Sequence, residues 1–547
     1  MKKNRILIFT FLLGMALWYT SGMLWAQEDE EPTNPFGVIE SYEDPGKADS
    51  LGVSWTRVRF QWAEVQAEGA DSWETAVSDE QIDAEINAGR EVVGLLIGIP
   101  EWARDENDLP RGLYLPHDNL DNTWAQFVRE AVSRYAGRID HWIIWNEPDI
   151  SDPHTPGHTW DGDVDDFMQL LRIAFLVVKE TNPDALIHLP AITYFWDPDY
   201  IDTFFDTLVA QPGAAENGYF FDVATTHLYF QPNHVYDLLH FFYKSMHRHG
   251  ITDKPVWLVE TNAPPIDDPY WTVEAWTLSV TLNEQAAYMP QAMVSALAAG
   301  AQRIAVYKLK DTPGDKAANP EPFGLVHRDG SRRPGFDTYR EAIKQLQGAT
   351  AVTRDRWDEV GQFQVYLPAQ TTTVLFARLP QAQVAKVPAL VERAILVDMW
   401  GQRLDDLLAH DRMFTIELPG ALCTQSIGDY CMIGGTTYYL IQNVPSPPPT
   451  PPPTLMPTAV PTEVATLTPS ATPTMAPTST KLPPPPPILT PSSTVPESGV
   501  MGTEAAASPV PAPVNEADAP HNRYIGGIGI FVVGVVFLGG WLVRRMK

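Results

Sequence analysis

Short apolar runs alternate with longer amphipathic stretches over much of the chain. Between about residue 34 and residue 347, runs rich in Val, Ile, Leu and aromatic residues are followed by segments whose apolar residues recur every three or four positions. The short runs are typical of buried parallel strands, and the longer period is typical of helices packed on them. The pattern predicts eight strands, at Phe36–Glu40, Trp55–Phe60, Val92–Ile97, His141–Trp145, Leu186–Leu189, Val223–His227, Val256–Val259 and Ile304–Lys308.

Helical segments are predicted between these strands, at Asp79–Gly89, Thr123–Tyr135, Asp163–Thr181, Val235–His249 and Glu284–Ala299. Eight strand–helix units in a stretch of this length are typical of a (β/α)8 barrel. An open doubly wound sheet is the alternative, and such sheets commonly carry a glycine-rich turn after the first strand. No GxGxxG sequence follows Phe36–Glu40. We therefore predict an α/β fold with a (β/α)8 TIM barrel over residues 34–347.

A different pattern begins after the predicted barrel. From residue 350 to residue 443 apolar and polar residues alternate, which is typical of antiparallel strands with one buried face. The clearest strands are Phe363–Leu367, Thr373–Ala377, Ala394–Asp398 and Met413–Leu418. They predict a small β-sandwich. We interpret it as a structural accessory of the barrel, and a carbohydrate-binding module is the alternative.

Both ends of the chain carry membrane-targeting patterns. Basic residues precede an apolar run and then small residues near Ala26, which predicts a secretory signal peptide over residues 1–26. An uncleaved first membrane helix is the alternative. Residues 524–543 are uncharged and apolar and are followed at once by basic residues, which predicts a transmembrane helix with a short cytoplasmic C-terminus. We expect a single-pass, membrane-anchored protein on the extracellular face of the cell membrane.

Composition adds a stalk and excludes one class of partner. Many of the 50 prolines lie in residues 445–520 together with Thr, Ser and Ala, which predicts a disordered linker that holds the folded part away from the membrane. The formal net charge of −30 argues against a nucleic-acid partner. Cys423 and Cys431 are the two cysteines and are too few for a zinc site. Outside the cell we expect them to form a disulfide, with a reduced pair as the alternative. No metal or cofactor is predicted, and neither is an oligomeric state.

Two glutamates stand at the ends of predicted strands. Glu147 comes two positions after the predicted strand His141–Trp145, and Glu260 directly follows the predicted strand Val256–Val259. In a parallel barrel the side chains that follow the strands gather at one mouth. A pair of carboxyl groups there can cleave a glycosidic bond, because one protonates the leaving oxygen while the other attacks the sugar or activates water. The distance between the two groups distinguishes retention from inversion, and the sequence does not contain that distance.

These motifs resemble those of the clan A glycoside hydrolases, most of all family 39 and its relatives. The resemblance begins with Trp145-Asn146-Glu147-Pro148-Asp149 and Val259-Glu260-Thr261-Asn262. It continues in residues 52–62, which resemble the clan's second strand, and in residues 226–229, which resemble its sixth. The resemblance implies a retaining mechanism with a covalent glycosyl-enzyme intermediate, in which Glu147 is the acid/base and Glu260 is the nucleophile.

The same resemblance implies roles for neighbouring residues. Asn146 is expected to hold the 2-hydroxyl of the sugar, and His227 is expected to line the sugar subsite. Arg57 and Tyr229 are expected to contact the nucleophile. A positive charge beside a carboxylate lowers its pKa and keeps it ionised.

Aromatic side chains are the remaining candidates for sugar binding, because their planes stack on the apolar faces of sugars. Trp102, which follows the third predicted strand, is the best candidate for such a platform. Many clan members carry a Trp at the end of the eighth strand, whereas this chain has Tyr307 followed by Lys308. We expect Tyr307 to stack. Lys308 pairs either with the carboxylate of a uronic acid or with an acid of the barrel itself.

The predicted function is that of a retaining glycoside hydrolase acting on extracellular oligo- or polysaccharides. The alternative is a catalytically inactive cell-surface protein that binds carbohydrate. A binding protein has no chemical need for both carboxylates, which favours the enzyme. A scaffold or adhesion protein would explain the stalk but would leave the paired glutamates without a role.

Overall fold

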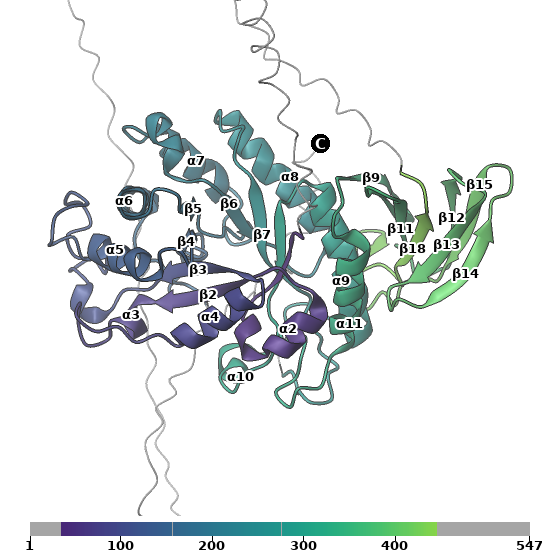
Figure 1. The fold of residues 1–547 in the computed structure, drawn as a ribbon, viewed down its shortest axis with the longest axis horizontal. Helices are drawn as coiled ribbons and strands as arrows, with labels where there is room; N and C mark the ends of the chain where they lie inside the picture. Colours follow the sequence, from purple (N-terminus) through teal and green to yellow (C-terminus); the bar gives the residue numbers. More distant parts are fainter. Residues whose placement is uncertain (1–33, 156, 275, 446–547) are drawn as a thin grey trace, which may run out of the picture. The chain divides into compact units, whose positions relative to one another are not determined.

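The structure, a computed structural model, describes residues 34–445 except residues 156 and 275 (Figure 1). The predicted signal peptide, linker and transmembrane helix lie outside the described residues. Among the helices of this described part, none combines the length and the apolar character needed to cross a bilayer.

Eight parallel strands form the first sheet, in the order β5-β4-β3-β2-β1-β8-β7-β6. Backbone bridges from His188 to Val223 and from Ile192 to Thr226 connect the two outer strands, so the sheet is nearly closed as a barrel. The strands are β1 Phe36–Val38, β2 Trp55–Gln61, β3 Glu91–Ile97, β4 His141–Ile144, β5 Leu186–His188, β6 Ala224–His227, β7 Val256–Thr261 and β8 Arg303–Val306. The prediction of these eight strands is confirmed.

Helices connect successive strands of the barrel (Figure 1). The helices are α2 Pro45–Leu51, α3 Trp62–Val65, α4 Asp79–Asn87, α5 Thr123–Tyr135, α6 Val164–Thr181, α7 Tyr200–Ala210, α8 Pro232–Arg248, α9 Leu282–Ala298, α10 Asp315–Ala318 and α11 Pro334–Leu346, with short 3-10 turns at Ser41–Glu43, Glu101–Ala103 and Ala215–Phe220. Ser78, Asp163 and Thr281 form capping boxes that fix where α4, α6 and α9 begin. The five predicted helices are present, and the structure adds α2, α3, α7, α10 and α11.

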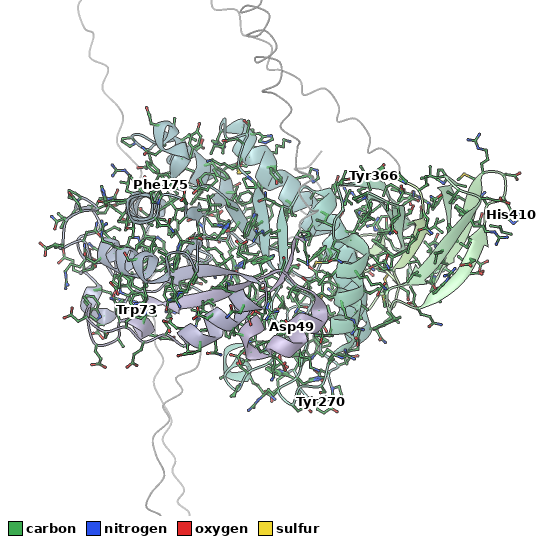
Figure 2. All side chains as sticks on the ribbon, in the orientation of Figure 1. Asp49, Trp73, Phe175, Tyr270, Tyr366 and His410 are labelled. Atoms are coloured by element: carbon green, nitrogen blue, oxygen red, sulfur yellow. A yellow bond between two sulfur atoms is a disulfide. The ribbon has the colours of Figure 1, made fainter. Side chains whose placement is uncertain are left out.

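Most of the largest fully buried side chains are aromatic. Figure 2 draws the side chains on the ribbon. Trp73, labelled in that figure, packs against Phe127 and Tyr135 of α5. Trp142 on β4 is fully buried and lies against Gly94 on β3, where a glycine leaves the room that the indole ring occupies.

Replacing Gly94 by Ala is expected to destabilise the barrel by about 1–3 kcal/mol, the usual cost of forcing extra atoms into a packed core. A Cβ atom at this position would overlap the ring of Trp142. Gly46, in the first turn of α2, is the matched control, because the nearest atom to its added Cβ is 3.9 Å away. Chemical denaturation of the two variants checks this, and equal unfolding midpoints would contradict the described packing.

The second part of the fold is antiparallel. One sheet has six strands in the order β14-β13-β18-β11-β10-β9, and β12 pairs with β15 in a second sheet. The strands are β9 Ala351–Trp357, β10 Val360–Tyr366, β11 Thr371–Ala377, β12 Gln383–Pro388, β13 Arg393–Asp398, β14 Arg403–Leu408, β15 Met413–Leu418, β16 Ser426–Ile427, β17 Tyr430–Cys431 and β18 Tyr438–Gln442. One hydrophobic cluster includes Leu375 and Leu440 from the first sheet and Val387 and Phe414 from the second. The two sheets therefore share a core, as in a β-sandwich.

A short hairpin, β16 and β17, carries the two cysteines at its base. Cys423 and Cys431 form a disulfide, so the pairing expected for an exported chain is present. Helix α9 of the barrel contacts the antiparallel part through Gln291, whose amide nitrogen donates to the carbonyl of Gly435 at 2.9 Å and whose amide oxygen accepts from the backbone of Gly434 at 2.9 Å.

Candidate active site

The end of β4 has an unusual backbone that positions Glu147. Trp145 and Glu147 have φ angles of 72° and 48°, a left-handed conformation that non-glycine residues rarely adopt. Hydrogen bonds hold it in place: the N–H of Trp145 donates to Leu96 O at 2.9 Å, and that of Glu147 donates to Ala191 O at 3.0 Å. Strained conformations of this kind cluster at functional sites.

Irregular strand pairing positions Glu260. The register between β6 and β7 shifts between Thr226 and His227, and the register between β7 and β8 shifts between Leu258 and Thr261. After the shift, His227 is paired with Glu260. Such bulges redirect side chains and are common beside active sites.

The ring of His227 connects the two glutamates. Its Nδ1 lies 2.6 Å from Oε1 of Glu147, and its Nε2 lies 3.6 Å from Oε1 of Glu260. The structure thus brings the two predicted carboxyl groups to opposite ends of a single imidazole ring. Because β4 and β7 supply them from different parts of the chain, this juxtaposition depends on the nearly closed barrel.

Two donors hold the carboxyl group of Glu260. Nη2 of Arg57 lies 2.5 Å from Oε1, and the hydroxyl of Tyr229 donates to Oε2 at 2.5 Å. Burial is the largest influence on Arg57 and lowers its pKa, but the charge and the hydrogen bond of Glu260, with smaller contributions from Tyr307 and Tyr229, together raise the pKa above its usual value. Burial and the same negative charge raise the pKa of Tyr229, so its hydroxyl keeps its proton. Both carboxyl oxygens of Glu260 therefore accept hydrogen bonds, one of them from a charged guanidinium.

Glu147 has the opposite environment. Burial raises the pKa of its carboxyl group to about 7; His227 opposes this shift, and the negative charges of Glu260 and Asp149 add to it. No described residue makes a hydrogen bond to its Oε2. A carboxyl group of this kind can hold a proton near neutral pH and deliver it to a leaving group.

Asp149 belongs to the site although the sequence analysis assigned it no role. Its Oδ2 accepts hydrogen bonds from the backbone N–H and the hydroxyl of Thr193, at 3.0 and 2.6 Å. Burial raises its pKa to about 6. Its place in the motif, two positions after Glu147, was a signal that could have pointed to it.

Asn146 and Tyr307 lie in the same region. Asn146 is 4% exposed, and its Oδ1 has no hydrogen-bond partner within the described part of the chain. Tyr307 packs edge-on against Phe323 with ring centres 5.5 Å apart, and Phe323 packs against Tyr229 at 5.8 Å. Asn262 fixes this group, because its side-chain amide donates to the carbonyls of Tyr307 and Phe323 at 2.7 and 2.8 Å. Phe323 and Asn262 were also not predicted as site residues.

Trp102 is not brought to the carboxyl groups by any contact that the structure describes. Its indole N–H donates to the carbonyl of Gln66 at 2.6 Å, and its ring packs edge-on against Trp62 at 6.1 Å. These contacts are those of a packing residue, although the side chain is only half-buried.

Lys308 forms an ion pair within the barrel. Its Nζ lies 2.6 Å from a carboxylate oxygen of Glu40 and 2.9 Å from one of Asp315. Burial is the largest influence on Lys308 and lowers its pKa, but Glu40, Tyr307 and Asp315 together raise the pKa well above its usual value. The charge is compensated within the protein, which removes the reason for assigning a uronic acid to this lysine.

The site is more enclosed than a position at the barrel mouth suggests. The side chains of Glu147 and Glu260 are 1% and 0% exposed. Tyr229 and Phe323 are themselves buried, and Tyr229 contacts Glu260 directly. Within residues 34–445, apart from 156 and 275, no group of three or more His, Cys, Asp or Glu side chains is arranged to hold a metal ion.

Solved structures of glycoside hydrolases are similar to this fold. A family 39 glycoside hydrolase from Bacteroides cellulosilyticus matches with a TM-score of 0.57 and 16% identity over 76% of this chain and 82% of that one. The chain has the fold of these glycoside hydrolases. A glucosidase from Croceicoccus marinus matches with a TM-score of 0.51 and 13% identity over 73% and 91% of the two chains.

A monomeric β-xylosidase from Caulobacter crescentus has a TM-score of 0.50 and 14% identity over 75% of this chain and 97% of that one. No sequence profile of a known protein family matches the chain, and no curated protein sequence matches it significantly. The likeness to family 39 that the motifs indicate is therefore supported at the level of the fold.

Proposed function

We propose that the chain is a retaining glycoside hydrolase in which Glu260 is the nucleophile and Glu147 is the acid/base. The observation that supports this most directly is the contact of one His227 ring with both carboxyl groups. Their surroundings differ in the way the reaction needs: Glu260 accepts two hydrogen bonds, and the pKa of Glu147 is raised to about 7. Glycosidic cleavage requires one ionised and one protonated carboxyl group.

In the first step a carboxylate oxygen of Glu260 attacks the anomeric carbon of the sugar. The bond from that carbon to the glycosidic oxygen breaks, and Glu147 gives its proton to the leaving oxygen. The products are the free alcohol and a sugar joined to Glu260 by an ester bond. Arg57 and Tyr229 hold the attacking group in place and balance its charge until the bond forms.

In the second step Glu147, now ionised, removes a proton from water. The water oxygen attacks the anomeric carbon, the ester bond to Glu260 breaks, and both carboxyl groups return to their starting states. Two displacements at one carbon restore its original configuration. Asn146, whose Oδ1 has no partner among the described residues, is proposed to accept a hydrogen bond from the 2-hydroxyl of the sugar. Tyr307 is proposed to line the same subsite.

A panel of aryl glycosides tests this function and identifies the sugar. Glucosides and xylosides come first, because the similar solved structures include a glucosidase and a β-xylosidase. Wild type and Glu260→Ala are assayed together. Release of the aryl alcohol by wild type alone supports the proposal, and absence of activity from both across the panel would favour a protein that binds sugar without cleaving it.

We expect kcat/KM to fall as the pH rises through about 7. Glu147 must carry a proton to act as the acid, and burial raises the pKa at which it loses that proton to about 7. The raised value means that the active form is present below this pH and is lost above it. A pH profile of kcat/KM checks this, and a profile that stays flat up to pH about 9 would show that another group is the acid.

The predicted ends of the chain complete the proposal. The signal peptide, linker and membrane helix inferred from the sequence would hold the hydrolase on the extracellular face of the membrane, where oligo- or polysaccharides are its substrates. Digestion of intact cells with a protease that cuts the linker, followed by detection of the released protein, tests this arrangement.

One observation favours the alternative of an inactive carbohydrate-binding protein. Glu147 and Glu260 have almost no exposed surface, so a sugar can reach them only if neighbouring side chains move. The retained pair of carboxyl groups favours the enzyme, since binding alone does not need both.

A further inference from the structure

A cavity lies between the start of α8 and the antiparallel sheet. Its volume is about 260 Å³. Gln231 and Gln291 line it from the barrel part, and Trp357, Arg378, Ile427 and Tyr430 line it from the antiparallel part. The cavity is separate from the paired carboxyl groups, because Glu147, Tyr229 and Glu260 are not among the residues that line it.

Arg378 is a buried cation without an acidic partner. Its side chain lies between two aromatic rings, 4.0 Å from the centre of Trp357 and 4.2 Å from that of Tyr430. Nη1 donates to the backbone carbonyl of Asp358 at 2.6 Å. None of the ion pairs formed by residues 34–445 includes Arg378, whereas neighbouring Arg354 pairs with Asp237 at 3.3 Å.

The charge of Arg378 is therefore poorly compensated. The residue is 8% exposed, and burial lowers its pKa to about 10. It is still ionised at neutral pH. A buried charge of this kind is stabilised when a counter-charge reaches it, and a planar guanidinium is well suited to a carboxylate.

Gln231, which lines the same cavity, has an acceptor without a described partner. The residue is 4% exposed, and its Oε1 is buried without a hydrogen-bond partner among the described residues. An amide oxygen accepts hydrogen bonds and cannot donate them, so its partner must be a donor such as a hydroxyl group. By contrast, Gln291 is satisfied by Gly434 and Gly435, so its role is structural.

The shape and walls of the cavity limit the ligand further. Ligand pockets usually enclose about 300–1,000 Å³, so a cavity of about 260 Å³ suits one ring rather than a chain of them. Phe376, Ile427 and Met432 give it apolar surface. Sugars present such a surface with an apolar face of C–H groups.

We propose that this cavity binds a single hexuronic acid residue, with its carboxylate on Arg378 and one hydroxyl donating to Oε1 of Gln231. A cation without an acidic partner, a buried acceptor without a donor and an apolar wall together complement a sugar acid. The site would be distinct from the catalytic pair and does not depend on the proposed hydrolysis.

Isothermal titration of the whole protein with D-glucuronate and D-galacturonate tests the proposal. We expect saturable binding of at least one of them, and binding at least ten times weaker for glucuronamide, which keeps the hydroxyls and lacks the charge. Arg378→Gln is expected to weaken binding at least tenfold. Arg356→Gln is the matched control, because Arg356 is on the same sheet and already pairs with Asp358 at 2.7 Å; it should bind like wild type.

Two further variants keep the test decisive. Because Arg378 packs between two rings, its replacement can impair folding; Ile427→Trp instead fills the cavity from a position on the exposed hairpin and should also abolish binding. Glu260→Gln should leave binding unchanged. The proposal is overturned if neither acid shows saturable binding up to about 20 mM, or if glucuronamide binds equally well. It is also overturned if Ile427→Trp binds like wild type or if Glu260→Gln loses binding.

Discussion

Replacing Glu260 by Ala is expected to reduce kcat/KM for aryl glycosides by roughly 10⁴-fold or more, the scale of loss when a covalent mechanism loses its nucleophile. Arg57 and Tyr229 would keep their positions but would lose the group that they hold. The alanine leaves space beside two hydrogen-bond donors. A small anion such as azide is therefore expected to restore turnover of activated substrates and to yield a glycosyl azide of inverted configuration. Initial rates and NMR of the product check both results.

Glu321→Gln is the matched control for this variant. Glu321 is also a buried glutamate, and its Oε1 accepts a hydrogen bond from the backbone N–H of Thr277 at 2.7 Å, which an amide oxygen can accept as well. It is expected to keep the wild-type kcat/KM. Equal losses in the two variants would mean that removing any buried carboxyl group disturbs the fold, and substantial activity in Glu260→Ala without azide would exclude Glu260 as the nucleophile.

Replacing Glu147 by Gln is expected to have an effect that depends on the leaving group. For substrates with poor leaving groups we expect a loss of roughly 10²–10⁴ in kcat/KM, because these need a proton in the first step. The dinitrophenolate group of a dinitrophenyl glycoside leaves without a proton. With such a substrate the variant should form the covalent intermediate at close to the wild-type rate. The fall in activity above pH about 7 should disappear in the variant, since the group responsible has been removed.

The variant Asp149→Asn tests how a neighbouring charge affects the pKa of Glu147. The negative charge of Asp149 contributes to the raised pKa of Glu147. Removing that charge should move the fall in activity to lower pH without abolishing it, because Glu147 is still present. A pH profile in which Glu147→Gln and Asp149→Asn behave alike would contradict the assignment of the acid to Glu147.

The sequence predicts the barrel well for a physical reason. Strands of a parallel sheet covered by helices are buried on both faces, so each appears as a short apolar run, and the eight runs are visible without knowledge of the fold. The two glutamates are equally visible, since each follows such a run. Helices α7 and α11 are less visible because the turns and prolines around them interrupt the apolar pattern.

Side-chain partners supplied by loops could not be predicted in this way. Asp315 reaches Lys308 from the segment after β8, and Phe323 from the same segment packs against Tyr229. Both contacts depend on how the segment after β8 folds back over the barrel. The spacing of apolar residues along the sequence does not predict such a path. Trp102 shows the converse: its position after β3 predicts a platform, and the contact that the structure adds is the hydrogen bond from its indole N–H to the carbonyl of Gln66, so its role as a platform stays a prediction.

The central claim is that Glu260 becomes covalently attached to the sugar, and trapping that intermediate tests it most directly. A glycosyl fluoride of the preferred sugar, with fluorine replacing the 2-hydroxyl, slows both steps, while its good leaving group lets the first one proceed. We expect the protein to be inactivated with one sugar attached, and mass spectrometry of its peptides to locate that sugar on Glu260. Turnover without a trapped intermediate, or a sugar on any other residue, would contradict the account.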